Sequence, residues 1–165
     1  MGLVGDNLNI YEQLEHEAYE NGILIKEVNF NSNSDGLYKN NKIALNKNRL
    51  NTMAEKTCTL IEELSHHHYN CGDILDDKDI TNRKQEYRAR LYSYNKLIGF
   101  NGLINAYKAN CQNAHEFAEY LNVTVEFLYD ALECYEAKYG EIMYFDNYMI
   151  IFRDGIRIIE NKKFG

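Results

Sequence analysis

The stretch that decides the fold of this chain is residues 52–69, which read Thr-Met-Ala-Glu-Lys-Thr-Cys-Thr-Leu-Ile-Glu-Glu-Leu-Ser-His-His-His-Tyr. Thr52 and Glu55 have the Thr-x-x-Glu spacing of a capping box, in which each side chain bonds the backbone N–H of the other residue. We therefore predict a helix that begins at Thr52 and continues to about Tyr69, with Gly72 as its natural stop.

The residues before this helix predict a shorter helix and a few strands. Residues 8–21 space their apolar side chains as an amphipathic helix does, and residues 23–28 are short and β-branched, as in a strand. Residues 36–45 are typical of a hairpin, because Asn40 and Asn41 tolerate the positive φ angles of a tight turn. A small antiparallel sheet is therefore expected beside the main helix.

Beyond the main helix, the pattern predicts further helices and then a return to strands. A long helix is expected at residues 82–98, with Tyr87, Leu91, Tyr94 and Leu97 or Ile98 on one stripe. Shorter elements follow, with helices at residues 102–109, 113–121 and 124–139 and strands at residues 141–145, 148–152 and 155–159. The order is typical of an α+β fold. We expect a single compact unit, with a helix-rich core over residues 1–99 and a helix-turn-helix-like (HTH-like) pair and C-terminal β-strands over residues 100–165.

Composition and charge indicate a globular protein and disfavour nucleic-acid-binding and membrane proteins. The 165 residues are 45% hydrophobic and 26% charged, as in globular proteins. Eighteen Lys and Arg against 25 Asp and Glu give a net charge of -7, which disfavours general binding to nucleic acid or to anionic lipid. No apolar run reaches the length of a membrane span, and the first residues lack a signal-peptide pattern. With four scattered cysteines as free thiols, we expect a cytoplasmic protein without a membrane partner.

The densest group of ionisable residues lies inside the main helix, at residues 62–68. Residues four apart share a helix face, so Glu62 and His66 converge, and Glu63 and His67 converge about 100° further round. Either pair could contribute metal ligands. Zinc peptidases use this spacing as His-Glu-x-x-His, where the imidazoles hold the metal and the Glu accepts a proton from water.

The simpler interpretation of this group is a solvated, charged helix face. Against it, the neighbouring Leu60, Ile61 and Leu64 predict that the helix is partly buried. Adjacent carboxylates are costly to bury without compensation. A metal ion would supply that compensation.

Several motifs, in order along the chain, carry a family resemblance. They are Gly36-Leu37-Tyr38, Ile43-Ala44-Leu45-Asn46, the helix ending in Glu62-Glu63-Leu64-Ser65-His66-His67, then Gly72-Asp73-Ile74 and Gln85-Glu86-Tyr87-Arg88-Ala89. Together they resemble the phage members of the ImmA/IrrE family of metallopeptidases. The resemblance implies a metal-dependent endopeptidase that acts on a repressor protein as its partner and substrate.

The same resemblance implies a site. Its metal ligands would be Glu62, His66 and Glu86, the last from the Glu-x-x-Ala setting on the following helix, and its general base would be Glu63. The implied cofactor is a divalent metal, zinc in the first place. The general base would pass the proton of the attacking water to the leaving nitrogen.

Glu62 departs from the family pattern, which has His at this position. A second carboxylate cancels more of the cation's charge and makes its water less acidic, and it shifts the preference from zinc toward manganese. Alternatively His67, Cys71 or Asp73 completes a more usual ligand set. A different class of function also stays open: a metallopeptidase fold with weak or no catalysis that binds and sequesters a regulator.

Residues 116–132 resemble an HTH unit, with the small Ala118 at the helix contact and Val123 at the turn. The second helix carries four carboxylates and one lysine: Glu126, Asp130, Glu133, Glu136 and Lys138. Such a helix would be repelled by DNA phosphates. We therefore expect packing against the rest of the chain, or protein docking, and no direct binding of nucleic acid.

Overall fold

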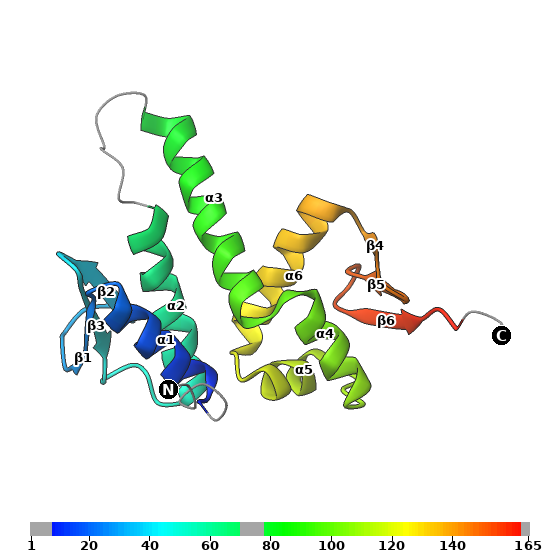
Figure 1. The fold of residues 1–165 in the computed structure, drawn as a ribbon, viewed down its shortest axis with the longest axis horizontal. Coiled ribbons are helices and arrows are strands. Elements are labelled where there is room, and N and C mark those ends of the chain that lie inside the picture. Colours follow the sequence, from blue (N-terminus) through cyan, green and yellow to red (C-terminus); the bar gives the residue numbers. More distant parts are fainter. Residues whose placement is uncertain (1–7, 70–77, 163–165) are drawn as a thin grey trace, which may run out of the picture. The chain divides into compact units, whose positions relative to one another are not determined.

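The structure is a computed structural model that describes residues 8–69 and 78–162. In chain order it contains α1 (Ile10–Glu20), β1 (Leu24–Val28), β2 (Gly36–Lys39), β3 (Lys42–Asn46), α2 (Met53–Tyr69), α3 (Lys78–Leu97), α4 (Gly99–Lys108), α5 (Ala114–Leu121), α6 (Val125–Tyr139), β4 (Ile142–Phe145), β5 (Tyr148–Ile151) and β6 (Arg157–Glu160), as Figure 1 shows. The α+β class is confirmed. The chain divides into two compact units, Met1–Ser93 and Tyr94–Gly165.

The first unit contains a three-stranded sheet in the order β1-β3-β2. The predicted hairpin is confirmed, because β2 and β3 are antiparallel and the turn residues Asn40 and Asn41 have φ angles of 51° and 56°. The expectation of a purely antiparallel sheet was wrong, since β1 pairs with β3 in parallel. The chain reverses direction twice, through residues 29–35 between β1 and β2 and again in the hairpin, so β3 runs in the same direction as β1.

Helices α1 and α2 pack against one face of this sheet (Figure 1). The core between them contains the fully buried Leu14, Ile43, Leu60, Ile61 and Leu64. This burial confirms that α2 is an internal helix with one solvated side, as its apolar residues predicted.

The capping box at the start of α2 is also confirmed. The backbone N–H of Glu55 donates to Thr52 Oγ1 at 3.1 Å, and the backbone N–H of Thr52 donates to Glu55 Oε2 at 2.8 Å. These backbone hydrogen bonds hold the pKa of Glu55 below its usual range. The start of the helix is therefore fixed by its own sequence.

We expect Thr52→Ala to lower the free energy of unfolding by about 1 kcal/mol, because one N-terminal N–H of α2 loses its acceptor. The Glu55 carboxylate should also stabilise the folded protein. This contribution to the free energy of unfolding should vanish as pH falls through the lowered pKa of Glu55, since the ionised carboxylate is the better acceptor. Urea unfolding of both proteins at neutral and acidic pH measures this. Thr81→Ala, at an exposed position inside α3, is the control. An equal loss in the control would show that the cap contributes nothing.

Helix α3 differs from the prediction in two respects. It begins at Lys78 instead of residue 82, and no Pro or Gly lies in that first turn to prevent it. The predicted stripe is confirmed at Tyr94 and Leu97, which are buried, but it was wrong at Tyr87, which is 36% exposed. In the preceding turns the small Ala89 and Ser93 are the buried residues instead.

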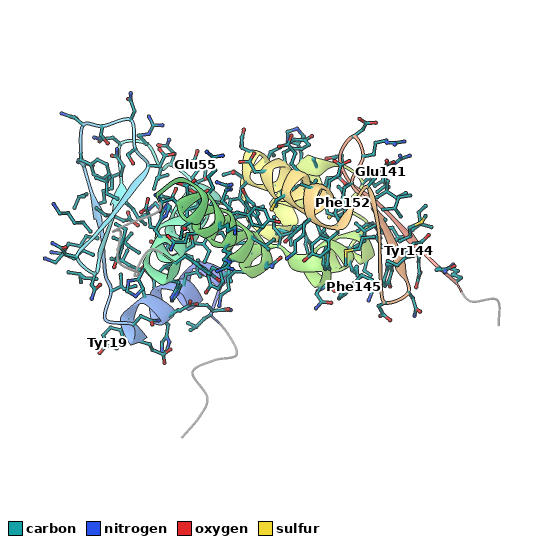
Figure 2. The ribbon with its side chains drawn as sticks, turned by 90° about the horizontal axis from the view of Figure 1, so that it is seen from above. Tyr19, Glu55, Glu141, Tyr144, Phe145 and Phe152 are labelled. Carbon is teal, nitrogen blue, oxygen red and sulfur yellow. The ribbon has the colours of Figure 1, made fainter. Side chains whose placement is uncertain are left out.

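The second unit contains α4, α5, α6 and the antiparallel meander β4-β5-β6. The HTH-like pair is present: Asn122 ends α5 in a left-handed conformation, and the Thr124 side chain caps α6. Ala118 and Val123 are buried, as predicted. Phe152, labelled in Figure 2, lies between β5 and β6, and its ring centroid is 6.1 Å from that of Tyr135.

Within the described residues, the helices are too short or too polar for a membrane span.

Candidate functional site

The Glu63 carboxylate lies against strand β2. A Cβ placed on Gly36 would come within 2.9 Å of both Glu63 Cγ and Glu63 Oε1, so the helix and the strand are in close contact here. The backbone N–H of Tyr38 donates to this carboxylate. Burial nevertheless raises the pKa of Glu63 to about 7, because the hydrogen bond offsets only part of the desolvation.

The hairpin turn explains why an N–H of β2 is available to Glu63. Lys39 and Lys42 form the pair that closes the turn, so Tyr38 and Ile43 form the next, non-hydrogen-bonded pair. The N–H of Tyr38 therefore points away from β3, toward the open edge of the sheet. At the same edge, Ser34 Oγ donates to the carbonyl of Gly36 at 2.5 Å.

His67 lies one turn after Glu63 on the same side of α2. Its Nδ1 is 2.6 Å from the Tyr38 hydroxyl, and the two rings are in edge contact at 5.4 Å between centroids. Burial and the neighbouring His68 lower the pKa of His67. The neutral imidazole is therefore favoured, and Tyr38 contacts both members of the Glu63–His67 pair.

Loss of the Tyr38 hydroxyl should weaken this arrangement. We expect Tyr38→Phe to lower the free energy of unfolding by about 1 kcal/mol, because the hydroxyl also donates to Asn41 Oδ1 at 3.0 Å. The control is Tyr19→Phe, since Tyr19 is 82% exposed and should change nothing. Chemical denaturation measures both; equal stability of the Tyr38 variant and the original protein would contradict the prediction.

A second polar group continues from His67 toward α1 and α3. The His68 ring contacts those of His67 and Tyr92, and Tyr92 donates to Glu17 Oε1 at 2.9 Å. His68 Nε2 is 3.3 Å from the same Glu17 oxygen. Burial, and then Glu17, raise the pKa of Tyr92 to about 12. Sequence reasoning missed Glu17 and Tyr92, since no local spacing connects residues on different helices.

The predicted metal ligands lie on other helix faces. Glu62 and His66 are both exposed on α2, about 100° from the Glu63–His67 side, and Glu86 is exposed on α3. Within residues 8–69 and 78–162, no three His, Cys, Asp or Glu side chains come together as a metal-binding group. Cys71 and Asp73, the other predicted candidates, lie outside the described residues.

The donor set has the chemistry of a cation site. Two carboxylates and one imidazole suit a divalent cation. Glu86, Ala89 and Ser93 share one face of α3, because they are three and four residues apart. Ser93 Oγ is 3.5 Å from the carbonyl oxygen of Ile61, so the Ser93 end of this face contacts α2. The structure does not bring the side chains of Glu62, His66 and Glu86 together.

Comparison with models of known families, with curated proteins and with solved structures gave no match.

Proposed function

We propose that this protein is a metal-dependent endopeptidase with Glu63 as its general base. The observation that carries the proposal is the half-buried Glu63 carboxylate, with a pKa of about 7, at the open edge of a sheet. A general base works best when its pKa is near the working pH. An exposed structural glutamate would keep a pKa near 4.5. Burial raises the pKa of Glu63 into the range that suits proton transfer near neutral pH.

The ligands in this proposal are Glu62, His66 and Glu86, as the resemblance to phage members of the ImmA/IrrE family implies. A divalent cation bound there, zinc or manganese, supplies Lewis-acid activation of water and of the peptide carbonyl. Glu63 takes the proton from the attacking water and delivers it to the leaving nitrogen. His67 lies beside Glu63 with its Nδ1 against the Tyr38 hydroxyl, and it would donate to the developing oxyanion only in its protonated form, through Nε2.

Strand β2 offers a place for an extended substrate. It is an edge strand of its sheet, and an extended peptide can pair with such an edge through main-chain hydrogen bonds. A peptide at this edge would lie beside Glu63, and it would pair with the outward N–H of Tyr38 by displacing the Glu63 carboxylate from that N–H. From the resemblance we propose a repressor protein as the substrate, in the cytoplasm of a cell that carries a phage or mobile element.

The experiment that tests this function combines metal binding with proteolysis. Protein purified without chelator should bind about one divalent ion per chain, and His66→Ala and Glu86→Gln should each lose it. The metal-loaded protein should cleave the repressor encoded beside its gene, and a chelator should stop the cleavage. The matched control is His115→Ala, because His115 is exposed on α5. Cleavage that persists after complete removal of metal would refute the proposal.

A second candidate is a binding module with the same fold and no hydrolysis. Glu62 and His66 are exposed, and Glu62 replaces the imidazole of the usual motif; both facts favour this candidate. It predicts a stable complex with the repressor, intact after long incubation, and no stoichiometric metal. Size-exclusion chromatography followed by electrophoresis of the complex distinguishes the two functions.

A further inference from the structure

The outer face of the first sheet, on the side away from α1 and α2, has an unusual composition. Alternation along the strands places eight residues on it: Leu24, Lys26 and Val28 of β1, Leu37 and Lys39 of β2, and Lys42, Ala44 and the buried Asn46 of β3. Figure 2 shows side chains extending from these strands on the side away from α2. We call this surface the basic sheet face.

The strand register mixes apolar and basic residues on this face. Lys42 pairs with Leu24 and Lys39, while Ala44 pairs with Lys26 and Leu37. Three of the apolar side chains are open to solvent, since Leu24 is 47%, Val28 37% and Leu37 51% exposed. The basic sheet face is therefore an apolar strip bordered by lysines.

The three strands contribute no carboxylate to the basic sheet face. The only acidic residue of the three strands is Glu27, which points to the opposite face and pairs with Lys56 Nζ at 2.9 Å. Within the described part of the chain, none of Lys26, Lys39 and Lys42 forms an ion pair. An acid-free face is notable in a chain with a net charge of -7. Its positive potential selects an acidic occupant.

The size of the outer face suits one helix. The sheet is mixed, with β1 and β3 parallel and β2 and β3 antiparallel. Three strands about 4.8 Å apart and up to five residues long give a face of roughly 10 by 16 Å, which suits one helix about 10 Å across. The geometry therefore matches a helix laid across the strands.

We propose that the basic sheet face binds an amphipathic helix of a partner protein, with an apolar stripe flanked by Asp and Glu. A second copy of this face is a poor occupant, because Lys26, Lys39 and Lys42 would meet the same lysines. An anionic membrane is also disfavoured, because polybasic lipid sites use about four to eight basic residues and the whole chain is negative. This proposal goes beyond the endopeptidase proposal and does not depend on Glu63.

The test uses the full chain and two synthetic helical peptides labelled for fluorescence anisotropy. Both peptides carry leucine at positions i, i+3, i+4 and i+7; one has glutamate on the flanks and the other has lysine. We expect only the glutamate peptide to bind. The double variant Lys26→Glu/Lys42→Glu should weaken it by at least about tenfold, because attraction becomes repulsion at two positions. Lys84→Glu and Lys162→Glu change exposed residues that do not belong to the basic sheet face, and these variants should bind as the original protein does.

Three results would overturn the proposal: equal binding of both peptides, equal losses in the double variant and the controls, or no binding of the glutamate peptide at low salt. Vesicles of phosphatidylglycerol form a third arm, and binding to them without binding to the peptide would assign the face to membranes instead. Circular dichroism of the double variant checks that it is folded. Because Glu63→Gln should bind the peptide normally, failure here is distinct from failure of the endopeptidase proposal.

Discussion

Replacement of Glu63 by glutamine is expected to lower the rate of the proposed cleavage by roughly 10²–10⁴-fold, the usual contribution of general acid–base catalysis. Glutamine keeps the shape of the side chain and can still accept the N–H of Tyr38, but it cannot take a proton from water. Metal binding should be unchanged. The measurement is the cleavage rate of the metal-loaded variant, with Glu119→Gln on the exposed surface of α5 as the control.

The same group predicts the dependence of cleavage on pH. Glu63 has a pKa of about 7, and only its ionised form accepts a proton, so the rate should be half its maximum at a pH of about 7 and should level above that pH. A cleavage rate that rises near pH 4.5, the ordinary pKa of glutamate, would show that burial does not set the pKa of the base. Equal rates for Glu63→Gln and the original protein would remove Glu63 from the mechanism.

The free energy of unfolding should fall as pH rises, whereas the cleavage rate should rise. The pKa of Glu63 is raised above its unfolded value of 4.5, so the folded state disfavours the ionised form. Below pH 4.5 the carboxyl is protonated in both states and costs nothing; as pH rises to about 7 the penalty grows to its full size, on the order of 3 kcal/mol. Glu63→Gln should therefore be more stable than the original protein at pH 8 and about equal at pH 4. Urea unfolding at the two pH values measures the difference.

Replacement of Gly36 by alanine is expected to destabilise the protein by about 1–3 kcal/mol, because it overpacks the contact between β2 and α2. The new Cβ would lie 2.8 Å from Thr59 Cγ2 and 2.9 Å from Glu63 Cγ, so the strand and the helix must separate. Such a shift displaces Glu63 from the edge of the sheet. We expect the proposed cleavage to fall by roughly tenfold to a hundredfold as well, since small misplacements of catalytic groups are costly.

A double-mutant cycle tests the physical cause. Thr59→Ser removes the closest atom, Thr59 Cγ2, and should recover part of the stability lost in Gly36→Ala. The single variant Thr59→Ser is the matched control. Strict additivity of the two changes in unfolding free energy would show that the close contact is not the cause.

Much of the fold could be predicted because its determinants are local. The capping box at Thr52 and the turn at Asn40 and Asn41 depend on residues within a few positions of each other, and both were found where the pattern placed them. The pairing of β1 with β3 could not be predicted, because it depends on how the chain between them crosses the sheet. The buried side of α3 was predicted at Tyr94 but missed at Ala89 and Ser93, since small residues give no hydrophobic periodicity.

By itself, the sequence determined that two Glu–His pairs, Glu62 with His66 and Glu63 with His67, lie on neighbouring faces of one helix, since the helical period sets that geometry. Only the tertiary structure decided which pair meets strand β2. It is the Glu63–His67 pair, because the strand approaches the helix at Gly36, where the absence of a side chain permits close contact. Burial on that side raised the pKa of Glu63, and no pattern of neighbouring residues contains that information.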